Sequence, residues 1–136
     1  MDTISEEDRS WAIYGDAAGL LVLTNIPLAN VIATLLIYLR VKGRALPFAR
    51  AHAAAALNFQ ATYSLAVLVV IASLLVAILS GRHDGMQQLQ GYIWLPRALV
   101  IYALLTAINV VFSILGAVAA SQLRDFNYRI AIPFTH

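Results

Sequence analysis

The sequence predicts an all-α polytopic membrane protein, and two observations predict it. First, 61% of the 136 residues are hydrophobic and only 12% are charged, against about 25% charged residues in an average soluble domain. Second, three apolar tracts are each long enough to cross a hydrocarbon core as a helix, which takes about 20 residues. These tracts are Ala17–Leu39, Ala61–Leu79 and Ala98–Ser121. The length fits a single integral membrane domain, residues 1–136.

The composition also limits the chemistry that the chain can perform. It has no cysteine, which excludes disulfides, thiolate metal sites and cysteine nucleophiles. A formal charge of +2 is too small to indicate a nucleic-acid partner. Glu6, Glu7 and Asp8 stand where a secretory signal peptide would be basic, so we interpret the N-terminus as mature sequence. The same acids suit the first turn of a helix, where the dipole is positive.

The first tract leaves two topologies open, because polar residues and a proline interrupt it at Thr24–Pro27. A proline there either kinks one helix or starts a new one. A kinked helix gives three membrane crossings. A helical hairpin turning at Asn25–Pro27 gives four membrane segments, with Ser5–Leu23 and Pro27–Val41 as its arms. The second arm is about 22 Å long, which is short for a full crossing.

The distribution of basic residues favours the N-terminal hairpin. Three crossings divide the nine Lys and Arg residues six to three between the two sides, whereas four segments divide them seven to two. Cytoplasmic loops carry the excess of Lys and Arg. We therefore expect four segments in the cytoplasmic membrane, with both termini in the cytoplasm.

The segment between the last two tracts, Ser80–Arg97, is polar and is expected to form a loop that returns to the interface through Tyr92 and Trp94. Its Arg82-His83-Asp84 sequence resembles a catalytic pair only superficially. No serine nucleophile motif, His-Glu metal motif or phosphate loop accompanies it. We expect no catalytic residue, no metal and no cofactor, and predict that the protein is not an enzyme.

Polar side chains stand at the start of the second tract. The stretch Arg50–Val70 begins basic, keeps His52, Asn58 and Gln60, and ends as hydrocarbon. We expect these three side chains at the inner headgroup level, where they form hydrogen bonds between helices or dock a partner. A ligand or haem site at His52 is the third alternative, and it would need an axial ligand facing a pocket.

Three further polar residues lie near or inside apolar tracts: Asp16, Asn30 and Asn109. Ionisable residues within the membrane are costly and mark candidate functional sites. Asp16 is interpreted as a solvated interfacial residue, a structural ion pair or hydrogen bond, or a proton or ion site. We expect the two asparagines to form hydrogen bonds across helices or to contact a partner.

Small residues recur at four-residue spacing, as Gly15 and Gly19 and then as Gly116 and Ala120. This spacing lets helix backbones approach closely. We expect the two pairs to pack helices together, either within the chain or against a foreign helix.

The segment between the first two tracts is basic. It carries Arg40, Lys42, Arg44 and Arg50 within eleven residues. Juxtamembrane basic residues attract anionic headgroups at about 1 kcal/mol each. We expect this loop to bind lipid headgroups.

A resemblance to a known family rests on four segments that occur in the family's order. They are SEEDRSWAIYGDAAGLL, IPLANVIATLLIYLRVKGRALPF, HAAAALNFQ and AASQLRDFNYRIAIPF. These segments resemble a bacterial family of small membrane proteins of unknown function, which is similar to the chloroplast import component Tic-twenty. The resemblance implies a helical protein with four membrane segments.

These observations predict a non-enzymatic integral membrane protein. Its role would be that of an accessory or scaffold subunit packing against a larger membrane complex. Its partners would be lipids and other membrane subunits or further copies of itself. The alternative, by analogy with Tic-twenty, is an oligomeric conduit or a membrane-protein biogenesis or translocation factor.

Overall fold

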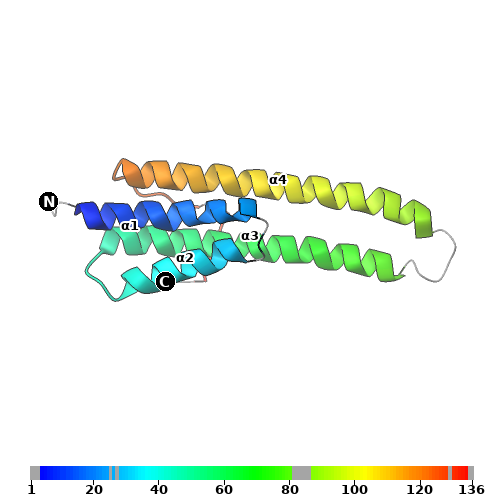
Figure 1. Ribbon diagram of the computed structural model, residues 1–136, viewed down its shortest axis with the longest axis horizontal. Coiled ribbons are helices and arrows are strands. Elements are labelled where there is room, and N and C mark those ends of the chain that lie inside the picture. Colours follow the sequence, from blue (N-terminus) through cyan, green and yellow to red (C-terminus); the bar gives the residue numbers. More distant parts are fainter. Residues whose placement is uncertain (1–3, 25, 27, 81–86, 129, 135–136) are drawn as a thin grey trace.

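The computed structural model describes residues 4–24, 26, 28–80, 87–128 and 130–134, and the side chains of 80 and 87–92 are not described. The described residues form helices and no strand, as predicted. In chain order the elements are α1 (Glu6–Ala17), the 3₁₀ helix η1 (Ala18–Thr24), α2 (Ala29–Lys42), α3 (Pro47–Ser80) and α4 (Gln87–Ser121). Figure 1 shows α3 and α4 as a long antiparallel pair, with α1 and α2 lying against one half of it.

The predicted N-terminal hairpin is present. Its first arm is α1 continued by η1, and its second arm is α2. Asn25 and Pro27 of the predicted turn lie outside the described residues. The Thr24 hydroxyl donates to the carbonyl of Leu21 at 2.7 Å and accepts the amide of Ile26 at 3.3 Å. One side chain therefore satisfies two backbone groups at the turn.

Two helices are long and apolar enough to cross a membrane. They cover Pro47–Leu79, with a mean hydropathy of 2.6, and Ile93–Ser121, with a mean hydropathy of 2.4. Only 6% and 11% of their most apolar windows are buried. The apolar helices of a water-soluble protein would bury such residues. Because these helices expose them, the surrounding medium is lipid, and the protein is an integral membrane protein.

The prediction of a loop as far as Arg97 is wrong. Helix α4 already begins at Gln87 and continues through Pro96. Glutamine and leucine favour helix, and an interior proline is tolerated in membrane helices. Trp94 is exposed, and its ring lies 5.7 Å from the Arg97 guanidinium. The side chain of Tyr92 and the Arg82-His83-Asp84 sequence lie outside the described part of the chain.

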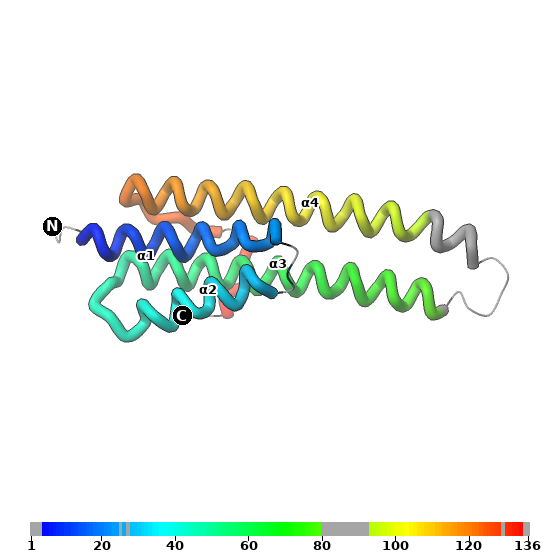
Figure 2. Tube along the Cα trace, in the orientation of Figure 1, coloured from blue at the N-terminus to red at the C-terminus, as the bar shows by residue number. Residues whose placement is uncertain are grey.

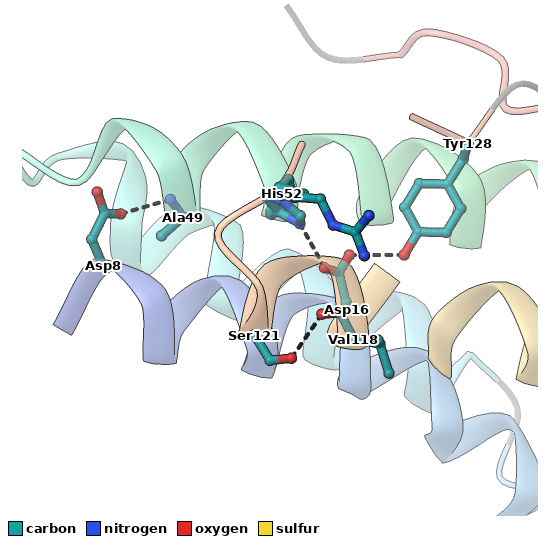
Figure 3. A network of polar contacts seen from close by, with 8 residues as sticks. Asp8, Asp16, Ala49, His52, Val118, Ser121 and Tyr128 are labelled. Atoms are coloured by element: carbon teal, nitrogen blue, oxygen red, sulfur yellow. Dashed lines mark hydrogen bonds and ion pairs between the residues drawn. The ribbon is translucent and has the colours of Figure 1, made fainter. Parts of the chain in front are cut away.

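The start of α3 is capped by a side chain from α1. Pro47 occupies the first helical position, where its missing N–H is harmless. The next two amides, those of Phe48 and Ala49, donate to the Asp8 carboxylate at 3.3 and 2.6 Å. Asp8 is buried, and Figure 3 shows its bond to Ala49. This contact fixes the first turn of α1 against the first turn of α3.

The C-terminal tail runs back across α3 (Figure 2). It starts after Leu123, whose φ of 56° ends α4 in a left-handed turn. The tail amide of Ile132 donates to the Thr62 hydroxyl at 2.8 Å, and the amide of Phe134 donates to the Asn58 side chain at 2.9 Å. The tail is thus held by side chains of α3.

Replacing Asp8 should show how much this cap contributes. We expect Asp8→Ala to lower the free energy of unfolding by about 1–2 kcal/mol, because two amides at the start of α3 lose their acceptor. Thermal unfolding in mild detergent, followed by circular dichroism, measures the change. Glu7→Ala is the matched control, since it removes an exposed pair with Arg44 that contributes about 0–1 kcal/mol. Equal losses for the two variants would contradict the capping role.

Candidate functional site

The Asp16 site consists of Asp16, His52 and Tyr128. The Asp16 side chain is fully buried. One carboxylate oxygen accepts the Tyr128 hydroxyl at 2.7 Å, and the other lies 2.7 Å from His52 Nδ1. Figure 3 shows the carboxylate between these two partners. The site therefore joins α1, α3 and the C-terminal tail.

The second ring nitrogen of His52 limits the protonation of the pair. His52 Nε2 lies 3.1 Å from the carbonyl oxygen of Arg124, and a carbonyl can only accept, so Nε2 carries a proton. Another proton is shared between His52 Nδ1 and Asp16. The pair is then either an imidazolium with a carboxylate or an imidazole with a carboxylic acid. Both forms have no net charge, which suits complete burial.

Tyr128 supplies the third contact of the site. Burial, and then the neighbouring Asp16 charge, raise the pKa of the Tyr128 hydroxyl above its ordinary value, so it stays protonated and remains a donor. Its ring stacks on Phe59 with the ring centroids 4.6 Å apart, and the Phe126 ring meets it edge-on at 4.8 Å. At Tyr128 the tail is therefore held by one polar bond and an aromatic cluster.

The Gln60 site consists of Asn30, Gln60, Asn109 and Ser113, all of them buried. The side-chain oxygen of Gln60 accepts the amides of Asn30 and Asn109 at 2.6 and 2.7 Å. Its NH₂ group donates to the Ser113 hydroxyl at 3.3 Å. One carboxamide on α3 thus connects α2 and α4.

Glycines allow the helices to approach at both sites. A Cβ at Gly19 would overlap the side chains of Gln60 and Ser113. A Cβ at Gly116 would overlap the Tyr128 hydroxyl and lie 2.9 Å from the Asp16 Cγ. The structure therefore places these two glycines where polar side chains from other elements need their space.

The other two small residues pack backbone against backbone. A Cβ at Gly15 would lie 3.3 Å from the Ala53 Cα. Ala120 is fully buried and belongs to the same core cluster as Ala12 and Ala53. All four small residues of the predicted pattern thus pack within the chain.

The structure distributes the predicted polar residues over three places. Asp16 and His52 form one site, while Gln60 forms another with both asparagines. Asn58 is half-buried and holds the tail through Phe134. His52 and Gln60 are 2% and 1% exposed, so neither reaches the surface to touch a partner. Both ring nitrogens of His52 are engaged, which leaves none for a haem or metal.

Asp8 and Tyr128 belong to this polar interior but were not predicted as members of it. Asp8 was assigned to the dipole of its own helix, but its carboxylate caps α3. Tyr128 lies 112 positions from Asp16, and no spacing links them. The only available signal was a tyrosine among the polar residues that follow the last tract.

The predicted headgroup residues, Arg40, Lys42, Arg44 and Arg50, are all exposed at one end of the bundle. Arg44 binds Glu7 at 2.8 Å. An open groove of about 370 Å³ lies between α2 and the start of α3, lined by Tyr38, Lys42, Pro47, Arg50, Ala51 and Ala54. Lipid binding there stays a prediction.

Alanine at Gly19 tests the close packing at the Gln60 site. We expect Gly19→Ala to lower the free energy of unfolding by about 1–3 kcal/mol, as overpacked positions do. Gly43→Ala is the control, because nothing lies within 4 Å of its Cβ position, and a change within about 0.5 kcal/mol is expected there. Thermal unfolding in detergent measures both. A neutral Gly19→Ala would show that η1 is not tightly packed.

Two substitutions at Asp16 separate hydrogen bonding from charge. Asn at position 16 can accept from Tyr128 and donate to a neutral His52. We therefore expect Asp16→Asn to lower the free energy of unfolding by less than about 1 kcal/mol. Asp16→Leu leaves both partners without their contact, and each unpaired buried group costs about 1–3 kcal/mol. Thermal unfolding, together with carboxypeptidase digestion of the tail, measures the difference. Equal damage from Asn and Leu would mean that the carboxylate itself is required.

Comparison with known proteins identifies the family. Within the described residues, no three His, Asp or Glu side chains gather as a metal site would need. No curated protein and no solved structure matches the chain. The model of the magnetosome magnetite crystal formation protein family matches residues 7–135. This match supports the predicted bacterial family of small membrane proteins but not the similarity to Tic-twenty. The chain belongs to the magnetosome magnetite crystal formation protein family.

Proposed function

We propose that this protein is a non-enzymatic scaffold subunit that serves magnetite crystal formation from within the membrane. One observation carries the proposal. Every buried side-chain nitrogen and oxygen in the described part of the chain has a hydrogen-bond partner. Catalytic groups need at least one polar atom left for a substrate, whereas structural groups are satisfied within the fold. The polar interior supports the task of holding helices together.

The surface of the α3–α4 pair supports packing against other membrane proteins. Beyond the N-terminal hairpin, large apolar side chains are exposed on both helices, among them Leu68, Val76, Leu99 and Leu104. Association of membrane helices relies on close packing of such surfaces. We assign this half of the pair as the face for a larger assembly in the cytoplasmic membrane or in a membrane derived from it.

The conduit alternative has less support. A pore made by several copies would need polar side chains on the outward faces of α3 or α4. The exposed Ser73 donates to the carbonyl of Val69 in its own helix, and its described neighbours outside the hairpin are mostly aliphatic. Nothing in the described part of this surface favours an aqueous lumen over lipid or protein.

Gentle purification from native membranes tests the scaffold role. A tagged chain should co-purify with a stoichiometric membrane partner or as a defined oligomer. Leu104→Trp, at a 60% exposed position on α4, should reduce this association severalfold. Leu36→Trp, at a 62% exposed position on α2, should leave it intact. Mass spectrometry and sizing of the detergent complex provide the measurement.

The cellular readout is the size distribution of magnetite crystals, measured by electron microscopy. Cells in which Leu104→Trp replaces the original chain should make altered crystals, and cells with Leu36→Trp should not. A lone monomer in mild detergent, together with normal crystals in both strains, would contradict the scaffold proposal.

A further inference from the structure

The N-terminal hairpin covers only one half of the α3–α4 pair. Its polar contacts on α3 run from Phe48 to Gln60. On α4, the Gln60 site includes Asn109 and Ser113. Gly116, which lies against the Asp16 site, follows about one turn further along α4. Figure 1 shows α3 and α4 continuing alone beyond the tip of the hairpin, where the first arm ends and α2 starts. The molecule is therefore four helical segments wide in one half and two in the other.

Charged residues place these halves relative to a bilayer. No Asp, Glu, Lys or Arg occurs at 51–79 of α3 or at 98–121 of α4, which correspond to about 44 and 36 Å of helix. A hydrocarbon core is about 30 Å thick. Arg50 marks one face, and Gln60 lies about 15 Å further along α3. The tip of the hairpin, at the level of Gln60, thus reaches the middle of the bilayer.

The hairpin tip is suited to lipid. Leu23, Ile26 and Leu28 are 59%, 63% and 48% exposed. In hydrocarbon, backbone polar groups must be satisfied by the protein. Thr24 does this at the tip by bonding both the Leu21 carbonyl and the Ile26 amide. An apolar surface, with one side chain that bonds two of the described backbone groups, fits a turn that ends within the hydrocarbon.

The C-terminal tail widens the same half. Its amides bind Asn58 and Thr62, which flank Gln60 on α3. Its exposed side chains include Ile130, Ile132 and Phe134. The tail therefore adds apolar volume to the half that already holds the hairpin.

We propose that the protein is a wedge in one leaflet and that its ligand is a strongly curved bilayer, with the basic end of the bundle on the convex side. Two extra helices of about 10 Å diameter add about 160 Å² to the cross-section of one leaflet. Curvature relieves the mismatch, because the convex leaflet has more area for each molecule. This inference needs only lipid and this chain, and does not depend on the scaffold role.

With no other membrane protein present, lipid and not a second copy is the occupant that we assign to the narrow half. The apolar windows of α3 and α4 are 6% and 11% buried. Outside the hairpin, the polar side chain Thr106 is already bonded to Tyr63 within the chain. A fluid lipid surface needs no directional contact.

Reconstitution into liposomes tests the wedge. The full-length chain carries a fluorophore on Ile4→Cys, because the protein has no cysteine of its own. It is mixed with phosphatidylethanolamine and phosphatidylglycerol and formed into liposomes of widely differing diameters. Protein and lipid fluorescence are then measured for each liposome. We expect the protein density to rise severalfold in the smallest liposomes, with most of the labelled basic ends accessible to an external quencher.

Two matched variants test the role of the tip. Leu23→Lys places a charge at the middle of the bilayer, and it should remove most of the curvature preference. Leu39→Lys is the control, because Leu39 is 56% exposed, like Leu23 at 59%, but stands beside Arg40 at the basic end. This variant should retain the curvature preference. If Leu23→Lys fails to insert, the depth of the tip is measured with a fluorophore on Leu23→Cys. We expect spin labels near the ends of the acyl chains to quench this fluorophore more strongly than headgroup labels do.

Three results would overturn the inference. The first is equal protein density in liposomes of all sizes. The second is a majority of basic ends inside the small liposomes. The third is stepwise bleaching that shows dimers without a curvature preference, which would assign the narrow half to a second copy. Loss of the native partner in the scaffold experiment would leave these measurements unaffected, so the two proposals fail separately.

Discussion

The structure depends on one constraint, which is that a carboxylate buried among apolar helices has to find all its partners within the chain. Asp16 is fully buried and is bonded by His52 from α3 and by Tyr128 from the tail. His52 in turn donates to the carbonyl of Arg124 just after α4. Three parts of the chain, α1, α3 and the C-terminal tail, therefore converge on this site. The free-energy cost of removing the Asp16 carboxyl group from water is tolerated only because its pair with His52 is neutral as a whole.

The Gln60 site repeats this arrangement without charge, two helical turns deeper along α3. Hydrogen bonds between membrane helices average about 0.6 kcal/mol, so the two sites specify which helices meet more than they stabilise them. Close approach is equally necessary, because Gly19 and Gly116 leave the space that Gln60 and Asp16 fill. Together the two sites fix how far the hairpin extends along α3, and that depth sets the shape of the whole molecule.

Hydropathy was sufficient to predict the helices, because apolar length is a local property. The last tract was predicted to end at Ser121, and α4 ends there. Its start was predicted eleven residues too late, since polar glutamines were taken for loop although they favour helix. The sequence also indicated which polar residues are costly in lipid. It could not indicate their partners, because His52 and Tyr128 lie 36 and 112 positions from Asp16 and only the packing of helices brings them together.

The same features explain why surfaces, and not the polar interior, are the place to look for function. The buried polar groups of the described chain are already bonded, so substrates or ions would have to displace contacts that hold the helices together. The exposed groups are of two kinds: basic side chains at one end, and aliphatic side chains along α3 and α4. The first kind suits anionic headgroups, and the second suits lipid chains or neighbouring helices. We propose that a membrane protein of this build acts on crystal formation through the membrane around the crystal, by recruiting neighbours along its narrow half and by favouring curvature with its wide half.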